Sequence, residues 1–214
     1  MIYIFGAGGF GRETLNIYLD LNKNEDLKGF VEENSKRKGQ IINDLPIYDI
    51  EDLQPDNNTK IIIAIGTPLR KRIIKELQKK GFEFDTVVHS STIMSKWVKI
   101  GKGSIITAGN VFTSQINIKE HVIVNLSCTI GHDVTINDFS TISPGVNISG
   151  KVNIGKQTFI GTGAIIVEGV NIGNRTFIGA GSVVTKDIPD DVLAHGNPAK
   201  IIKKLSSDDW KKLI

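Results

Sequence analysis

The sequence is poor in cysteine, since Cys128 is the only one among its 214 residues. A single cysteine excludes an internal disulfide and a cysteine-based zinc cluster, and it favours an intracellular location. No apolar run approaches the roughly 20 residues of a membrane-spanning helix, so we expect no membrane span. The opening "MIYIF" is too short for the apolar core of a signal peptide, and we therefore expect a cytoplasmic protein.

The chain also lacks a strong charge of either sign. Lysine and arginine number 26 against 23 aspartate and glutamate residues, which gives a net charge of +3. The surplus is spread along the chain rather than gathered in a basic stretch, so the composition gives no support to a nucleic-acid partner. We expect no metal either, because no zinc cluster can be built from a single cysteine.

The first 90 residues alternate between strand-like and helix-like patterns. Short apolar runs indicate strands at Ile2–Phe5, Leu27–Val31, Ile61–Gly66 and Asp85–His89, and amphipathic runs indicate helices at Glu13–Leu21 and Leu69–Lys80. Alternation of this kind predicts a small parallel sheet of the Rossmann-like α/β class.

The first predicted turn, "GAGGFG", fits the pattern G-x-G-x-x-G between a strand and a helix, which is a context for binding phosphate. Glu32 and Glu33 follow Gly11 by about twenty residues, where dinucleotide enzymes carry a ribose partner. However, a domain ending near Ser90 has room for about four strands, whereas the full two-half dinucleotide fold needs six. A single mononucleotide-binding half is therefore the better interpretation.

The second half has a different period. From Ile100 to Val184 an aliphatic residue recurs at every sixth position, fifteen times in all, and Phe112 is the one exception. The residue four places after each of these is small or β-branched in most repeats. These second positions include Ser104, Cys128, Val134, Ser140, Val146, Val152, Thr158, Ala164, Val170, Thr176 and Ser182.

A six-residue step fits one short strand and a corner, with both recurring positions facing inward. Three such steps form one triangular coil, so fifteen predict five coils stacked by parallel pairing at about 4.8 Å. The glycines that follow many repeat residues suit corners, where a side chain would be crowded. The second half is therefore predicted to be a parallel β-helix.

This repeat resembles the hexapeptide acyltransferases, a resemblance that implies a left-handed helix. Together with the glycine-rich N-terminal half, it is similar to the bacterial sugar acyltransferases, which include sialic acid O-acetyltransferase and nucleotide-linked 4-amino-sugar N-acetyltransferases of surface-glycan synthesis. We expect a nucleotide-sugar-binding domain at residues 1–90 and an acyltransferase domain at 91–214. "GNPAK" at Gly196–Lys200 matches the exit from the helix, and "SSDDWKKLI" predicts a terminal helix with Trp210 and Leu213 on one face.

His132 is the candidate general base. It occupies the third place of its hexad and not an inward one, and Gly150 follows 18 residues later, one coil on and about 5 Å away. Histidine suits proton transfer near neutral pH, and the Gly150 N–H is a candidate donor to an oxyanion. The active-site histidine of the family falls on His132. Asp133 either orients the imidazole or, as its neighbour on a strand, points away from it.

The other histidines and the cysteine have simpler interpretations. His121 is predicted to be solvated, His89 to line the domain junction, and His195 to lie near the acyl donor at the end of the helix. Cys128 occupies an inward position and is predicted to be a small buried hydrophobe rather than a nucleophile.

The resemblance implies that acetyl-CoA is the acyl donor and binds in a groove between subunits of a homotrimer. By position, the donor contacts fall on Gly150, Thr162, Ala180 and Lys186. The sequence departs from many relatives at Thr141, nine residues after His132, where they carry a second histidine. A hydroxyl or water must replace what that histidine does.

The resemblance further implies that the N-terminal half holds a nucleotide-sugar acceptor. The residues implied to bind it are Gly8, Gly9, Phe10, Glu32, Glu33, Gly66, Thr67 and Asn125. Phe10 stands where some relatives carry histidine, so the acceptor contacts there differ.

Three functions fit these observations to different extents. An acetyl-CoA-dependent N-acetyltransferase for the 4-amino group of a nucleotide-linked sugar explains both halves and the position of His132. A sugar O-acetyltransferase of the sialic acid type, or a transferase of a longer acyl group, keeps the same fold. A non-enzymatic β-helix scaffold or an NAD-binding protein leaves the spacing of His132 and Gly150 without a reason.

Overall fold

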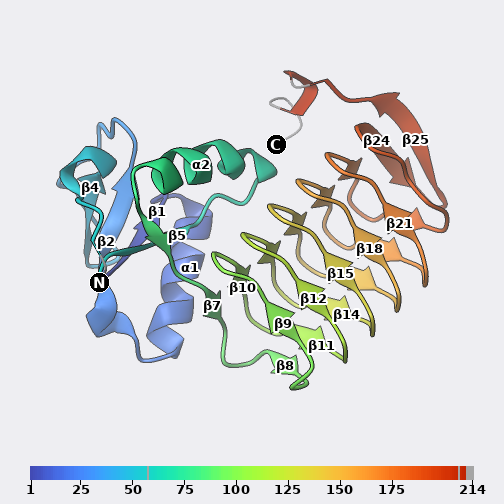
Figure 1. The fold of residues 1–214 in the computed structure, drawn as a ribbon, viewed down its shortest axis with the longest axis horizontal. Coiled ribbons are helices and arrows are strands. Elements are labelled where there is room, and N and C mark those ends of the chain that lie inside the picture. The colour runs from blue at the N-terminus through green and yellow to red at the C-terminus, as the bar shows by residue number, and fades with distance from the viewer. Residues whose placement is uncertain (57, 207, 211–214) are drawn as a thin grey trace.

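The structure, a computed structural model, describes residues 1–56, 58–206 and 208–210. An N-terminal α/β domain lies against one side of a triangular β-helix, which ends in a two-stranded hairpin (Figure 1). The predicted fold class is thereby confirmed in both halves. No helix among the described residues has the length and apolar character needed to cross a membrane.

The N-terminal domain is built on a six-stranded sheet with the order β3-β4-β2-β1-β5-β6. All neighbours in it are parallel except β3 and β4. Its strands are β1 (Ile2–Phe5), β2 (Leu27–Glu32), β3 (Ile41–Ile42), β4 (Leu45–Asp49), β5 (Lys60–Ile63) and β6 (Glu83–Phe84). Its helices are α1 (Gly9–Asp20), α2 (Lys71–Lys79) and the 3₁₀ turns η1 (Asn24–Asp26), η2 (Ile50–Asp52) and η3 (Pro68–Arg70).

The strand expected at Asp85–His89 was wrongly assigned to this sheet. Its core is β7 (Val87–Val88), which pairs with β10 of the β-helix and so forms the first strand of the second half. The six-residue spacing does extend back to Val88, but Met94 interrupts the aliphatic series and hides this continuation. Strands β3, β4 and β6 were not predicted.

The glycine-rich turn joins β1 to α1 through a close backbone contact. A Cβ on Gly11 would lie 1.8 Å from the carbonyl oxygen of Gly6, and Gly6 itself has a φ of +105°. Only glycine permits both features, because a side chain at either position would clash or strain the backbone. The turn therefore brings the N-terminus of α1 tightly over the end of β1.

The β-helix has three faces, each a parallel sheet. Face 1 contains β7 (Val87–Val88), β10 (Ile105–Ile106), β13 (Ile123–Val124), β16 (Thr141–Ile142), β19 (Phe159–Ile160), β22 (Phe177–Ile178) and β24 (Val192–Gly196), with β25 (Ala199–Lys204) antiparallel at its edge. Face 2 contains β8 (Ile93–Met94), β11 (Val111–Phe112), β14 (Thr129–Ile130), β17 (Asn147–Ile148), β20 (Ile165–Ile166) and β23 (Val183–Val184). Face 3 contains β9 (Lys99–Ile100), β12 (Asn117–Ile118), β15 (Thr135–Ile136), β18 (Asn153–Ile154) and β21 (Asn171–Ile172).

The corners are named by the faces that they join. Corner 1–2 comprises residues 107–109, 125–127, 143–145, 161–163 and 179–181; corner 2–3 comprises 113–115, 131–133, 149–151, 167–169 and 185–187; corner 3–1 comprises 101–103, 119–121, 137–139, 155–157 and 173–175. Residues 18 apart are therefore stacked neighbours on the same corner or face, as the pairing of Ile106 with Val124 shows.

The core of the β-helix is formed by the two columns that the repeat predicted. Repeat residues such as Ile142 and Ile160 are fully buried, and so are the second positions from Ser104 to Ser182. The predicted inward orientation of both columns is therefore confirmed. This stack of aliphatic residues fixes the register, because a shift of one residue would turn each strand inside out.

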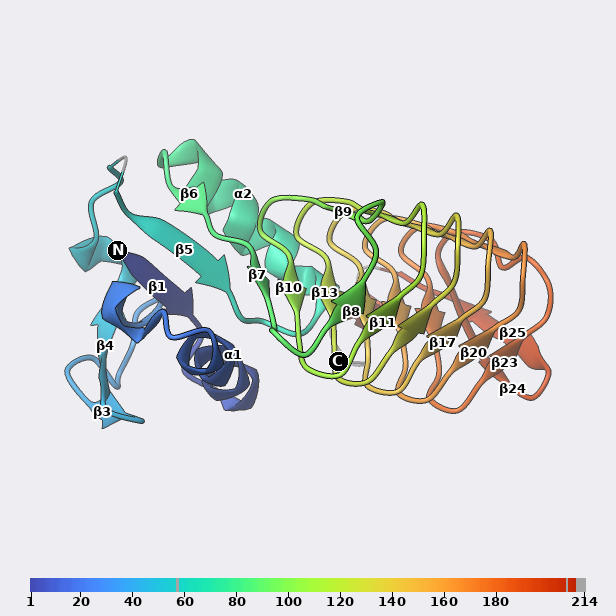
Figure 2. The same ribbon diagram turned by 90° about the horizontal axis from the view of Figure 1, so that it is seen from below.

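The N-terminal domain covers the first coils of face 1. Val87, Ile105 and Ile123 join the apolar core beneath the domain, together with Ile17 and Tyr18 of α1. Helix α2 lies along the same side of the β-helix (Figure 2). The two halves are thus held as one packed unit by apolar burial.

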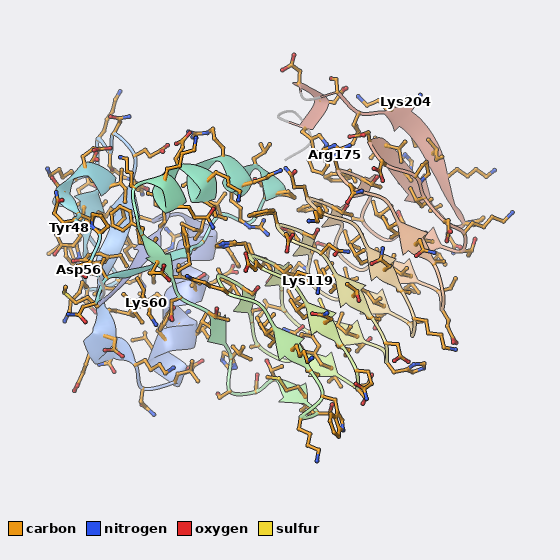
Figure 3. The ribbon with its side chains drawn as sticks, in the orientation of Figure 1. Tyr48, Asp56, Lys60, Lys119, Arg175 and Lys204 are labelled. Carbon is orange, nitrogen blue, oxygen red and sulfur yellow. The ribbon has the colours of Figure 1, made fainter. Side chains whose placement is uncertain are left out.

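The chain leaves the β-helix through the hairpin of β24 and β25, as the exit motif predicted (Figure 1). Arg175 on corner 3–1, labelled in Figure 3, contacts Asp191 with two hydrogen bonds of 2.5 Å. Residues 208–210 are helical. The ring of Trp210 packs against that of Phe177, with 6.0 Å between the two centroids. The remainder of the predicted terminal helix, including Leu213, lies outside the described residues.

Candidate active site

His132 lies at the middle of corner 2–3, directly after β14. Its Nδ1 is 2.8 Å from Oδ2 of Asp133. The two side chains meet because residue 133 is in the corner and not in a strand, and its φ of +59° turns its carboxylate back toward the ring. A carboxylate only accepts, so Nδ1 carries the proton and Nε2 is left with a free lone pair.

Gly150, one coil further on, lies directly against the imidazole. A Cβ at Gly150 would be 2.6 Å from both Cε1 and Nε2 of His132, so any side chain there would displace the ring. Among the described residues the structure shows no acceptor for the Gly150 N–H. The middle N–H of another corner, that of Lys156, donates to Oδ1 of Asn174 instead. The Gly150 N–H is therefore unpaired within the described part of the chain, although the residue itself is buried.

The other predicted donor-binding residues divide between two corners. Lys186 is exposed on corner 2–3, in the same column as His132 and Gly150. Thr162 and Ala180 stack on corner 1–2, where the Gly181 N–H donates to the Thr162 carbonyl oxygen at 2.8 Å. Face 2 separates the two corners, so a single chain does not bring these four residues together. Within the single chain, the His132 side chain is 52% exposed.

A pocket of about 330 Å³ lies between the N-terminal domain and corner 1–2. It brings together four residues predicted to bind the acceptor, namely Phe10, Gly66, Thr67 and Asn125. The other lining residues are Glu13, Thr141, Ser143 and Phe159. Gly8 and Gly9 lie at the N-terminus of α1 with open space beside them, outside this lining.

Glu32 and Glu33 lie apart from that pocket. Glu32 accepts hydrogen bonds from the Ala7 N–H at 3.4 Å and from Ser35 at 2.5 Å, and it pairs with Arg37. Partial burial acts to raise the pKa of Glu32, but the hydrogen bonds from Ser35 and Arg37 outweigh it, and the pKa is lowered. The glycine-rich turn thus has an ionised carboxylate beside it. Glu33 pairs with Arg72 at 3.2 Å.

His121 is buried, and the prediction of a solvated side chain was wrong. Its ring lies between Phe84, at 4.9 Å between centroids, and Phe139, at 5.5 Å. Burial, reinforced by the positive charge of Arg70, lowers the pKa of His121 to about 4. Its Nδ1 is buried with no hydrogen-bond partner among the described residues. His121 is therefore a neutral packing residue at the domain junction.

The two other histidines do not compete with His132 for its place. His89 lies at the domain junction, as predicted, with its Nε2 2.8 Å from Oδ2 of Asp20 in α1. His195 is an exposed residue of β24 that packs against Gly179, and its proximity to the donor stays a prediction. Cys128 is fully buried, and burial raises the pKa of its thiol to about 11. Its predicted role as a small core residue is confirmed.

Arg70 was missed by the sequence analysis. It ends η3 and is 1% exposed, and it reaches the β-helix through hydrogen bonds to Thr141, Ser140 and His121. Its position at the start of a basic helix gave no signal, because the basic residues that follow it are exposed or only partly buried. Only the packing of the two domains distinguishes it.

The chain combines a glycine-rich α/β domain with a hexapeptide β-helix that carries a histidine beside a carboxylate on one corner. The comparisons with known proteins identify the class to which this fold belongs. Residues 1–77 match the family model of the PglD N-terminal domain, and residues 151–186 match that of the bacterial transferase hexapeptide repeat.

Solved structures resemble the chain over nearly its full length. The acetyltransferase domain of PglB from Neisseria gonorrhoeae is 30% identical, with 94% of this chain and 98% of that chain covered and a TM-score of 0.84. WeeI from Acinetobacter baumannii is 30% identical, with 94% and 99% covered and a TM-score of 0.86. A variant of perosamine N-acetyltransferase from Caulobacter crescentus, in complex with CoA and GDP-perosamine, is 27% identical, with 95% and 97% covered and a TM-score of 0.87.

The chain belongs to this family of bacterial sugar acyltransferases with a left-handed β-helix. It is an acyltransferase.

Proposed function

We propose that this protein transfers the acetyl group of acetyl-CoA to the 4-amino group of a nucleotide-linked amino sugar in surface-glycan biosynthesis. The observation that carries the proposal is the arrangement of His132 between the Asp133 carboxylate and the Gly150 backbone. The related structures support the substrate class, since one holds CoA with GDP-perosamine and another, the PglB domain, holds acetyl coenzyme A.

His132 is the general base of the proposed reaction. Its Nε2 has a free lone pair because Nδ1 donates to Asp133, so it accepts the proton that the acceptor amine loses as the nitrogen attacks the acyl carbon. Asp133 fixes the tautomer and stabilises the imidazolium that forms. The Gly150 N–H donates to the acyl oxygen as negative charge develops there. The acyl group passes directly to the acceptor, because the buried Cys128 thiol offers no nucleophile.

The N-terminal domain, residues 1–90, is proposed to bind the acceptor, and residues 91–214 to bind the donor and carry the base. The pocket formed by Phe10, Gly66, Thr67 and Asn125 would hold the sugar. The N–H groups at Gly8 and Gly9 begin α1 and suit the nucleotide phosphates. Glu32 and Glu33, at the end of β2, would face the nucleoside.

The split of the donor residues between two corners supports a homotrimer with its sites between subunits. Face 2 exposes Ile93, Val111 and Ile165, which are 67%, 36% and 42% accessible. If this face turns toward a threefold axis, corner 2–3 of each subunit meets corner 1–2 of the next. Gly150 and Lys186 of one subunit would then lie beside Thr162 and Ala180 of its neighbour, with acetyl-CoA between them.

The trimer also brings His132 near the acceptor pocket of the adjacent subunit, because that pocket borders corner 1–2. Both proposed substrates are intracellular metabolites, so the reaction is placed in the cytoplasm.

A screen of acceptors tests this function. Purified protein is incubated with acetyl-CoA and nucleotide-linked 4-amino sugars, with the matching 4-hydroxy sugars and free sialic acid as controls, and the release of CoA thiol is followed. We expect release only with amino sugars. Release with sialic acid alone would instead show O-acetylation, and NAD retained through purification without any CoA release would contradict an acyltransfer role.

A further inference from the structure

Thr141 is an exception in an otherwise apolar column. The outward residues of face 1, joined in register by the ladder, are Val87, Ile105, Ile123, Thr141, Phe159 and Phe177. The first three are covered by the N-terminal domain, and the last two stack at 4.8 Å beside Trp210. Thr141 lies between these two covered regions, where the acceptor pocket opens. A polar side chain occurs in this column only at the pocket.

The Thr141 hydroxyl accepts a hydrogen bond from the buried guanidinium of Arg70. Nη1 of Arg70 donates to Oγ1 of Thr141 at 2.7 Å. Nη2 donates to the carbonyl oxygens of His121 and Ser140 at 2.7 and 2.8 Å, which fixes the plane of the group. These three contacts join the end of η3 to face 1 of the β-helix.

Arg70 has no ion-pair partner among the residues that the structure describes, and all three of these acceptors are neutral. Burial lowers the pKa of Arg70 to about 9, which leaves the side chain charged at neutral pH. A buried cation without a counterion is costly. Its three hydrogen bonds offset part of that cost and fix the guanidinium against the β-helix.

The contact also determines what Thr141 offers to the pocket. Because Oγ1 accepts from Arg70, its own proton must point elsewhere. Thr141 is 3% exposed, and among the described residues the structure shows no acceptor for that proton. Thr141 is one of the residues that line the pocket, together with Phe10, Thr67 and Asn125.

We propose that Thr141 is a specificity-determining residue that donates a hydrogen bond to an oxygen of the acceptor sugar, and that Arg70 is the positioning residue that orients and polarises this hydroxyl. The inference rests on the proposed function, since it assigns a contact within the acceptor pocket. It places Thr141 on the acceptor and not on the acyl donor. The guanidinium strengthens the donor, because withdrawal of electron density from Oγ1 makes its proton more acidic.

Thr141→Val tests the contact without a change of shape. We expect the KM for the acceptor to rise by about five- to tenfold, the loss of one hydrogen bond, while the KM for acetyl-CoA stays unchanged. Thr141→Ser keeps the hydroxyl and is expected to restore the acceptor KM to within about twofold of wild type. A rise in the KM for acetyl-CoA instead of the acceptor would overturn the assignment, and so would an unchanged acceptor KM in Thr141→Val.

Arg70→Lys tests the positioning role, with Lys71→Met as the matched control. Lysine keeps the charge but cannot span three acceptors, so the acceptor KM should rise as in Thr141→Val. Lys71 links the same two domains through Gln157 at 2.7 Å, but neither residue lines the acceptor pocket. Lys71→Met is therefore expected to leave the acceptor KM at its wild-type value.

The double variant Arg70→Lys/Thr141→Val separates positioning from a structural role. If Arg70 acts through Thr141, the acceptor KM of the double variant equals that of Thr141→Val alone. If the two substitutions instead raised the acceptor KM independently, so that their fold-changes multiplied in the double variant, the positioning role of Arg70 would be overturned. The thermal unfolding of Arg70→Lys is recorded as a check of its folding, and the Thr141 variants carry the test if this variant does not fold. Absence of acyl transfer in the wild type would contradict the proposed function itself, which distinguishes that failure from an unchanged KM in an active variant.

Discussion

The ring of His132 lies directly against the backbone of Gly150, one coil further along corner 2–3. The contact is so close that a Cβ at Gly150 would lie 2.6 Å from both Cε1 and Nε2 of the imidazole. The N–H of the same glycine has no acceptor among the described residues, so one residue both makes room for the base and offers an unpaired hydrogen-bond donor beside it.

Gly150→Ala is therefore expected to lower kcat by about a hundredfold, because the methyl group displaces the imidazole. The fold should persist, since the backbone at Gly150 is not in the left-handed region. Steady-state rates and thermal unfolding curves measure the two effects. Lys156→Ala, at an exposed position on corner 3–1, is the control and should keep wild-type kcat. Full activity in Gly150→Ala would contradict the placement of the ring.

Ile165→Lys is expected to break the proposed trimer. A lysine ammonium beside the exposed apolar side chains of face 2 cannot be buried against two other subunits without a large desolvation cost. Light scattering after gel filtration should show monomers, and acyl transfer should fall with the trimer. Ile41→Lys, at an isoleucine of β3 that is 71% exposed, is the matched control. A trimeric Ile165→Lys variant would exclude face 2 as the interface.

The stability of the protein is expected to fall as the pH drops from about 6.5 to 4. The pKa of His121 is lowered to about 4 in the folded state, whereas in the unfolded chain it is near 6.5, so the unfolded chain binds the additional proton across this interval. The loss attributable to His121 amounts to up to about 3 kcal/mol of unfolding free energy.

His121→Asn provides the comparison for this effect. Asparagine tolerates the positive φ of 55° at this position and does not titrate. Urea unfolding at a series of pH values should show a weaker dependence in the variant between pH 4 and 6.5. Equal slopes in both proteins would mean that His121 is not the responsible group.

Thiol reagents are expected to leave the native enzyme active. Cys128 is fully buried and burial raises the pKa of its thiol to about 11, so little reactive thiolate exists at neutral pH. Titration with a chromogenic disulfide should detect the thiol only in denaturant, and Cys128→Ala should retain acyl transfer. Rapid inactivation of the native protein that Cys128→Ala abolishes would require a different mechanism.

The β-helix could be predicted in detail because its inward positions follow from one period. The buried columns around Ile142 and Cys128 fell where the six-residue repeat placed them. Periodicity does not describe contacts between domains, which is why His121 was wrongly predicted. Phe84 of β6 and Phe139 cover its ring, and Phe84 belongs to the other domain.

In the candidate site, likewise, the sequence predicted only the contacts between residues stacked on successive coils of the β-helix. The 18-residue spacing brought Gly150 to His132, whereas the hydrogen bond to Asp133 depends on a corner conformation that the sequence did not specify. Arg70 escaped notice because nothing in the basic segment that it begins distinguishes a buried guanidinium from exposed ones. The meeting of η3 with Thr141 arises only from the docking of the two domains.

The rate of acceptor-dependent CoA release by His132→Ala is the most direct test of the proposed mechanism. With acetyl-CoA and the amino sugar on which the wild type acts, we predict that the variant turns over about 10² to 10⁴ times more slowly. Its unfolding curve and oligomeric state should match those of the wild type, because the ring is half exposed and fills no part of the core. Near-wild-type turnover in His132→Ala would contradict the assignment of this histidine as the base.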